Sequence, residues 1–205
     1  IMLFRLVFVI FMLLARIAWA DDFSDALKEY SKGNYSEAFR GFLVVANRGD
    51  ASAQYAIALM YDDGQGVPQD YQEAVKWYRL AAEQGHAKAQ FNLGNMYNQG
   101  KGVPQDYQEA VKWYRLAAQQ GVPNAQFNLG VMYDKGQKVP QDYQEAVKWY
   151  RLAAEQGYAN AQNNLGVMYD EGKGVDVNLI KAHMWYNIAA ANGSKSSSKW
   201  RDELT

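Results

Sequence analysis

A tandem repeat is the feature that most constrains the fold of this chain. The string QDYQEAVKWYRLAA begins at Gln69 and recurs at Gln105 and at Gln141, so each copy follows the previous one by 36 residues. Repeats of this length are stacked supersecondary units, each too small to bury a core alone. We therefore predict four 36-residue units within 51–194, near 51–86, 87–122, 123–158 and 159–194.

Each unit is predicted to contain two helices. In the first helix of the second unit, Ala89, Leu93, Met96 and Tyr97 share one apolar face at helical spacing. Gly94 lies inside this helix, where glycine costs about 1 kcal/mol relative to alanine. We therefore expect a neighbouring helix to approach Gly94 closely. The pairs together predict an all-α fold, a superhelical solenoid of antiparallel helix pairs.

The second helix of a unit is predicted to begin after an aspartate. Asp70 can cap the first backbone amides, and Glu73 follows three residues later, which is the acidic form of a capping box. The loop before it is rich in glycine, which accepts a positive φ. Lys138 stands where the other units have Gly66, Gly102 and Gly174, so we expect strain in that loop.

Two flanking segments are predicted to close the array. Residues 22–50 match the repeat at the same step, but the loop between their two helices is five residues shorter. This turn, KGNYSEAF, resembles the tetratricopeptide repeat, so we expect an N-terminal capping unit of that kind. Residues 195–205 contain KWRDELT and are expected to begin a C-terminal capping helix; the sequence leaves open whether that helix is complete.

The repeated unit also carries a family resemblance. The pattern A-x-A-Q-F-N-L-G-N-M-Y-x-x-G-x-G-V-P-x-D-Y-x-x-A-V-x-W-Y-x-x-A-A-x-x-G resembles the Sel-1-like repeat family, a relative of the tetratricopeptide repeats, over about 51–194. The resemblance implies a right-handed superhelix that works as a protein-binding scaffold or adaptor, often exported in bacteria. Some cysteine-rich relatives are linked to β-lactam binding, but this chain has no cysteine.

Composition disfavours several functional classes. The net charge of −1 gives no basic surface for nucleic acid. Without cysteine there is no thiol catalysis and no cysteine-rich metal site. His86 and His183 are too far apart along a solenoid to share a metal, and each is expected to be a partly buried, satisfied histidine. We therefore expect no enzyme, no cofactor and no metal site.

The N-terminus has the layout of a secretory signal peptide. Arg5 precedes an unbroken apolar run over 6–15, and Ala18-Trp19-Ala20 supplies a small-x-small cleavage signal. The run is shorter than the roughly 20 apolar residues of a membrane span. We expect residues 1–20 to be removed after Ala20, and a periplasmic or secreted protein with no membrane span after cleavage; the sequence does not distinguish the two locations.

Candidate binding residues recur on the first helices, which line the concave face of a helical solenoid. An amide both donates and accepts a hydrogen bond, so a ladder of amides can bind the backbone of a peptide. Each can equally tie its own helix to a neighbouring segment. The concave-face candidates are Asn92, Asn128, Asn164, Gln90, Gln126 and Gln162.

Two further columns recur on the second helices. The tryptophans Trp77, Trp113, Trp149 and Trp185 are interpreted as packing between units rather than as binding anchors. The lysines Lys76, Lys112 and Lys148 follow glutamates by three residues, so we expect solvated ion pairs rather than a nucleic-acid site.

Two functional hypotheses follow from the sequence. The first is an exported interaction scaffold that binds an unidentified protein or peptide on its concave face. The alternative is an envelope-ligand binder or a hydrolase acting on cell-wall or β-lactam compounds, by analogy with the cysteine-rich relatives. The second requires a cluster of reactive side chains, and no spacing in the sequence predicts one.

Overall fold

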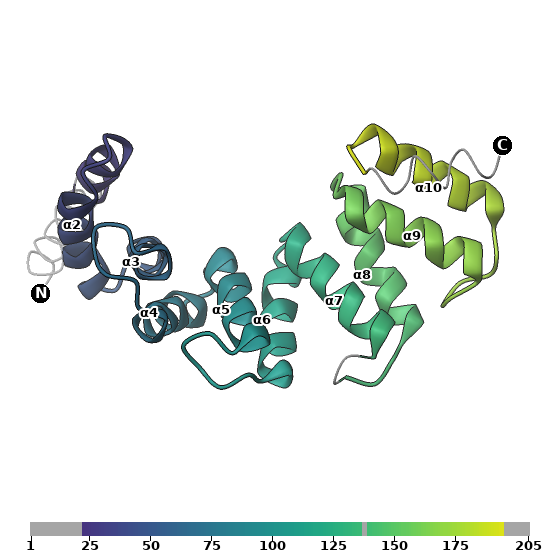
Figure 1. Cartoon of the computed structure of the whole chain (residues 1–205), viewed down its shortest axis with the longest axis horizontal. Coiled ribbons are helices and arrows are strands. Elements are labelled where there is room, and N and C mark those ends of the chain that lie inside the picture. The colour runs from purple at the N-terminus through teal and green to yellow at the C-terminus, as the bar shows by residue number, and fades with distance from the viewer. Residues whose placement is uncertain (1–21, 137–138, 195–205) are drawn as a thin grey trace, which may run out of the picture. The chain divides into compact units, whose positions relative to one another are not determined.

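The computed structural model describes residues 22–136 and 139–194, and all regular structure in these two ranges is helical. Residues 22–31 form a first helix. It is followed by α2 (Tyr35–Asn47), α3 (Ala51–Asp63), α4 (Tyr71–Glu83), α5 (Ala87–Gln99), α6 (Tyr107–Gln119), α7 (Pro123–Lys135), α8 (Tyr143–Glu155), α9 (Ala159–Glu171) and α10 (Leu179–Ala191) (Figure 1). The predicted all-α solenoid of helix pairs is therefore confirmed.

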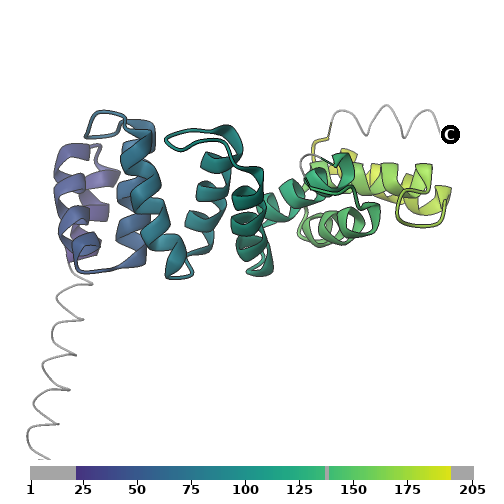
Figure 2. The same ribbon diagram turned by 90° about the horizontal axis from the view of Figure 1, so that it is seen from below.

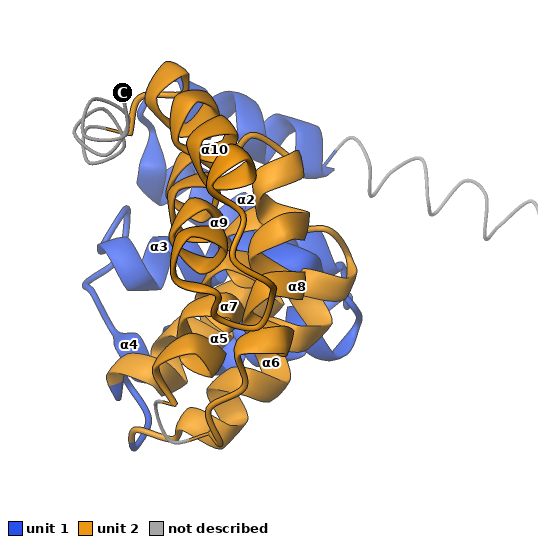
Figure 3. Cartoon of the chain, turned by 90° about the vertical axis from the view of Figure 1, so that its right-hand side faces the viewer, with its two compact units in different colours: residues 1–89, 100–104 blue, residues 90–99, 105–205 orange. Residues whose placement is uncertain are grey.

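The chain divides into two compact units (Figure 3). The first unit comprises residues 1–89 and 100–104, and within it α3 packs on both α2 and α4 (Figure 2). The second unit comprises residues 90–99 and 105–205. Within it each helix from α6 to α10 packs on the next one along the chain.

The predicted aspartate caps start α4, α6 and α8, whereas Asn178 caps the second helix of the fourth repeat, α10. The Asp70 carboxylate accepts from the backbone N–H groups of Gln72 at 2.9 Å and Glu73 at 3.1 Å. The reciprocal half of the capping box is wrong, because the Asp70 N–H donates to the carbonyl of Tyr61 at 2.9 Å. Glu73 pairs with Lys76 instead. The Asp70 N–H therefore fastens the end of the loop back to α3.

The predicted close approach of a neighbouring helix to Gly94 is confirmed, and the group that approaches is a tyrosine ring. A Cβ added to Gly94 would lie 2.7 Å from Cδ1 and Cε1 of Tyr114, a side chain from α6 that is 1% exposed. Gly130 faces Tyr150 and Gly166 faces Tyr186 in the same way. Each glycine thus creates the space in which the second helix of its own repeat inserts a tyrosine into the core.

The loop glycines contact the preceding repeat. Gly102 has a φ of 69°, and a Cβ there would lie 2.2 Å from the carbonyl oxygen of Tyr71. A Cβ added to Gly174 would likewise lie 2.4 Å from the carbonyl oxygen of Tyr143. Both contacts require a residue without a side chain. The predicted strain at Lys138 falls outside the described residues.

The terminal predictions also fall outside the described residues. They concern the signal peptide over 1–20 and the C-terminal capping helix over 195–205. Among the helices that the structure describes, none has the length and apolar character needed to cross a membrane.

Candidate functional site

The three predicted glutamines lie in the interior. Gln90, Gln126 and Gln162 are 4%, 3% and 2% exposed. In the Gln126 side chain, Nε2 donates to the carbonyl of Ala118 at 3.0 Å, and Oε1 accepts from Nε2 of Gln156 at 2.8 Å. One buried amide thus joins the end of the preceding helix α6, its own helix α7 and the end of α8.

The same connection recurs in the other repeats. Gln162 donates to Ala154 at 2.9 Å and accepts from Asn192 at 2.9 Å. Gln90 accepts from Gln120 at 2.8 Å. In Gln126 and Gln162 the amide nitrogen donates and the amide oxygen accepts within the protein, so neither residue presents a free amide to a ligand.

The predicted asparagines are half-buried. Asn128 is hydrogen-bonded to the hydroxyl of Tyr114, and Asn164 to the hydroxyl of Tyr150, each tyrosine belonging to the preceding repeat. Burial raises the pKa of Tyr114 to about 12, so its hydroxyl stays protonated. Asn92 is also half-buried. These contacts favour the interpretation in which the asparagines tie successive repeats together.

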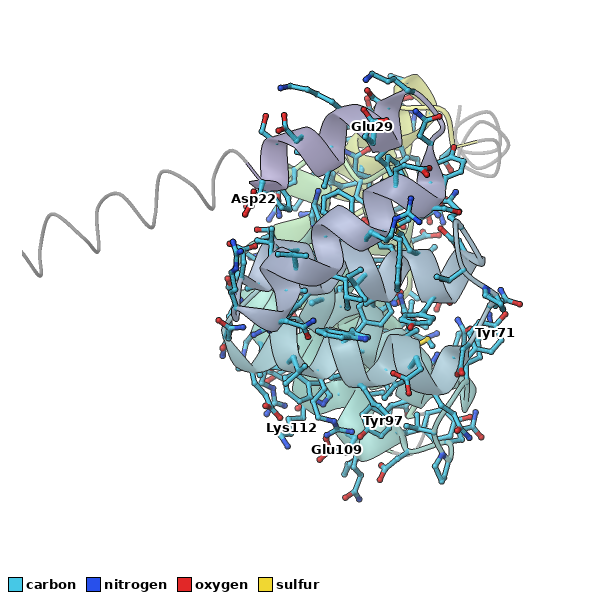
Figure 4. All side chains as sticks on the ribbon, turned by 90° about the vertical axis from the view of Figure 1, so that its left-hand side faces the viewer. Asp22, Glu29, Tyr71, Tyr97, Glu109 and Lys112 are labelled. Carbon is cyan, nitrogen blue, oxygen red and sulfur yellow. The ribbon has the colours of Figure 1, made fainter. Side chains whose placement is uncertain are left out.

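The tryptophan and lysine columns are consistent with structural roles. Trp113 is 5% exposed, and its Nε1 donates to Glu109 at 3.1 Å. Trp77 and Trp185 pack against buried core clusters. Lys112 pairs with Glu109 on the surface of α6 (Figure 4). Exposed pairs of this kind contribute little to stability.

An apolar pocket lies in the first unit, and we call it the N-terminal pocket. Its volume is about 440 Å³, within the range of ligand clefts. Its walls come from the helix over 22–31, from α2, from α3 and from the start of α5. The lining residues are Phe23, Leu27, Tyr30, Phe42, Ser52, Tyr55, Ala56, Leu59, His86, Ala87 and Lys88.

The first helix supplies one wall of the N-terminal pocket. Phe23, Leu27 and Tyr30 recur at i, i+4 and i+7, so they share one face of that helix. The rings of Phe23 and Tyr30 lie 5.3 Å and 6.4 Å from the ring of Phe42 on α2. Leu27 nevertheless remains 47% exposed. Leu27 is thus an exposed apolar side chain at the mouth of the N-terminal pocket.

His86 and Tyr55 also line the N-terminal pocket. Their rings stack with centroids 4.6 Å apart. The His86 Nδ1 accepts from the backbone N–H of Ala89 at 3.2 Å, so the imidazole caps α5. Burial and, after it, the charge of Lys88 lower the pKa of His86, and Asp50 opposes them. The ring therefore favours its neutral form, which the cap requires.

Of the two histidines expected to be satisfied, His86 is and His183 is not. His86 caps α5, as described above. His183 on α10 contacts Asn187 through Nδ1 at 3.1 Å, but its Nε2 is buried and has no hydrogen-bond partner in the described part of the chain. Within those residues no three histidine or acidic side chains form a group that could hold a metal.

The sequence contained a signal for the N-terminal pocket that the repeat pattern obscured. Residues 22–50 were predicted only to form an N-terminal capping unit. The positions after the first repeat also depart from the other copies. His86 stands where later repeats have Val122 and Tyr158, and Lys88 stands where they have Asn124 and Asn160. Both departures fall at residues that line the N-terminal pocket.

Stacked helix pairs with an open apolar pocket define a helical-repeat scaffold. The Sel1 repeat profile matches four consecutive segments, residues 51–86, 87–122, 123–158 and 159–194. The chain therefore belongs to the Sel1 repeat family. Proteins of this family are generally scaffolds for protein–protein interaction and are typically non-catalytic. No curated protein sequence matches the chain.

Solved structures share this fold. A Sel1 repeat protein from Oxalobacter formigenes is 37% identical, with a TM-score of 0.80, and the match covers 88% of this chain and 74% of that one. The c5321 protein, a protective antigen present in uropathogenic Escherichia coli strains displaying an SLR fold, is 31% identical with a TM-score of 0.88. That match covers 93% of this chain but 42% of c5321.

A more distant neighbour shares the fold alone. The Helicobacter pylori cysteine rich protein B is 23% identical with a TM-score of 0.51, and the match covers 64% of this chain and 94% of that one. This likeness carries no argument about activity or ligand.

Proposed function

We propose that this chain is an exported scaffold that binds a protein partner by taking an apolar side chain of that partner into the N-terminal pocket. One observation carries the proposal: an open pocket of about 440 Å³ lined by large apolar side chains. Membership of a family of interaction scaffolds supports a protein as the occupant. Interface energy concentrates where an apolar or aromatic anchor fills a desolvated pocket.

The proposed role is non-catalytic. The lining of the N-terminal pocket contains no carboxylate, and its histidine caps a helix through Nδ1. General acid–base chemistry needs a titratable group directed at a substrate. The alternative, an envelope-ligand binder or a hydrolase, remains a prediction of the sequence.

A pair of matched variants tests the pocket. Leu27→Asp places a charge at the mouth of the N-terminal pocket. Leu80→Asp makes the same change on α4, outside the pocket. The two leucines are similarly exposed, at 47% for Leu27 and 44% for Leu80. Both sites are exposed, so both variants should fold. Peptides selected from a random library on the purified chain should lose binding to Leu27→Asp and keep it to Leu80→Asp.

Two outcomes of the selection refute the proposal. In one, every selected peptide binds Leu27→Asp as tightly as the original chain. In the other, the loss occurs with Leu80→Asp and not with Leu27→Asp, which moves the binding surface to the second helices. Circular dichroism of both variants verifies that each comparison is made between folded proteins.

Export is the second part of the proposal. It is supported by Arg5, the apolar run over 6–15 and the Ala18-Trp19-Ala20 signal. Mass spectrometry of the protein from a bacterial envelope fraction should give a mature N-terminus at Asp21. Recovery from the cytosol with residues 1–20 still attached contradicts export and leaves the binding proposal untouched.

A further inference from the structure

The N-terminal pocket carries a single fixed charge in addition to its apolar lining. Lys88 is the one lysine, arginine or acid among the lining residues, and it is exposed. No ion pair within residues 22–136 and 139–194 engages it. A cation without a partner at the mouth of an apolar pocket favours an anion on the occupant.

The charge belongs to this copy of the repeat alone. The counterparts of Lys88 in the other repeats are Ser52, Asn124 and Asn160, all uncharged. The acids beside the lining residues are occupied elsewhere: the Asp50 carboxylate accepts from the backbone N–H of Ala53 at 2.8 Å and caps α3, Asp22 pairs with Arg48, and Glu29 pairs with Lys32. The cation therefore occurs only where the pocket lies, and the nearby acids do not neutralise it by direct contact.

The positions of the apolar lining and of Lys88 limit how far apart the apolar group and the anion of the occupant can be. Lys88 follows directly on His86 and Ala87, which are themselves pocket residues. The apolar group and its carboxylate must therefore be close together. The last residue of a peptide satisfies this condition, since its side chain and its carboxylate leave the same Cα atom.

We propose that the N-terminal pocket binds the carboxyl-terminal residue of a partner chain, with a large apolar side chain inside the pocket and the terminal carboxylate beside Lys88. This inference rests on the proposed function and adds the chemical class of its ligand. The Ser52 hydroxyl at the mouth offers the carboxylate a further hydrogen-bond donor.

The experiment compares one peptide in two chemical forms. A peptide selected from a library with free carboxyl termini, labelled for fluorescence anisotropy, is prepared as the free acid and as the C-terminal amide. Binding of each form is measured to the purified chain, to Lys88→Gln and to Lys28→Gln. Lys28 is an exposed lysine on the first helix, paired with Asp25 and outside the N-terminal pocket, so it is the matched control.

The carboxylate contact predicts a defined pattern of affinities. Amidation should weaken binding to the original chain by about 1.4- to fivefold, the range expected of an exposed charge pair. Lys88→Gln should weaken binding of the free acid by the same factor and leave that of the amide unchanged. Lys28→Gln should change neither, and added salt should reduce the difference between acid and amide.

Several results overturn this inference. The inference is wrong if the acid and the amide bind the original chain equally. It is also wrong if Lys88→Gln weakens the binding of both forms by the same factor. Selected peptides that bind through an internal segment, and still lose binding to Leu27→Asp, refute the terminal carboxylate but retain the proposed function. If every peptide fails while octanoate binds, both the inference and the protein partner are wrong.

Discussion

Replacing Gln126 by methionine tests whether the buried amides hold the repeats together. Methionine has a similar length and no hydrogen-bonding group of comparable strength. The change removes the bond from Nε2 to Ala118 at 3.0 Å and the bond from Gln156 to Oε1 at 2.8 Å. The Gln126 side chain is 3% exposed, so water cannot replace these bonds at its own position.

The structure sets the size of the expected effect. A neutral hydrogen bond contributes about 0.5–1.5 kcal/mol net. The carbonyl of Ala118 keeps a second bond, from the N–H of Gly121 at 3.0 Å, so it is not left unsatisfied. Gln156 is exposed and can turn to water. We therefore expect Gln126→Met to lower the free energy of unfolding by about 1–2 kcal/mol.

Urea unfolding followed by circular dichroism measures this change. The midpoint should fall while the slope with urea concentration stays unchanged. Gln156→Met is the matched comparison. It leaves the buried Oε1 of Gln126 without its donor, and an unsatisfied buried acceptor costs about 1–3 kcal/mol, so we expect it to cost at least as much as Gln126→Met. The double variant should cost little more than Gln126→Met, because the bond between the two residues is already absent.

Two results would refute this reasoning. If Gln126→Met is as stable as the original chain, the buried glutamines do not tie the repeats together. If it stays fully stable but loses peptide binding, the glutamines form the ligand site that the sequence predicted.

Three further predictions concern single positions. Gly130→Ala places a Cβ 2.5 Å from the ring of the buried Tyr150 and should destabilise by about 1–2 kcal/mol despite the better helix former; an unchanged melting temperature contradicts the close approach. The lowered pKa of His86 means that the unfolded chain binds the proton more readily, so stability should fall as pH drops through the unfolded pKa of about 6.5 toward the folded value. His86→Asn keeps a capping side chain without titration, so its urea midpoint should fall less between about pH 7.5 and 5.5; parallel curves for the two proteins refute this. Lys138→Gly restores the residue found at the matching loop positions and should stabilise by about 0.5–1 kcal/mol, and a lower urea midpoint contradicts it.

Features set by local chemistry could be predicted from the sequence. Asp70 caps α4 because a side-chain oxygen at that position reaches backbone amides two and three residues ahead. Gly94 was predicted to admit a neighbouring group because a glycine inside a helix has a cost that a close contact can offset. The structure supplies the identity of that group, the ring of Tyr114.

Features that depend on the packing of several helices could not be predicted. Gln126 bonds to a carbonyl eight residues earlier and an amide thirty residues later, and no periodicity within one helix reveals either partner. The N-terminal pocket draws its walls from four segments, and the fourth begins at His86. The sequence shows that Lys88 departs from the repeat, but only the structure places Lys88 in the same pocket as Phe23 on the first helix.

A hydrogen–deuterium exchange footprint of a selected peptide tests the central claim most directly. Bound peptide should slow exchange in the segments 23–30, 52–59 and 86–88, which contain all the lining residues of the N-terminal pocket except Phe42. Exchange around Leu116 and Asn164 should stay unchanged. Protection confined to those second-unit segments, with none at the N-terminal pocket, contradicts the account.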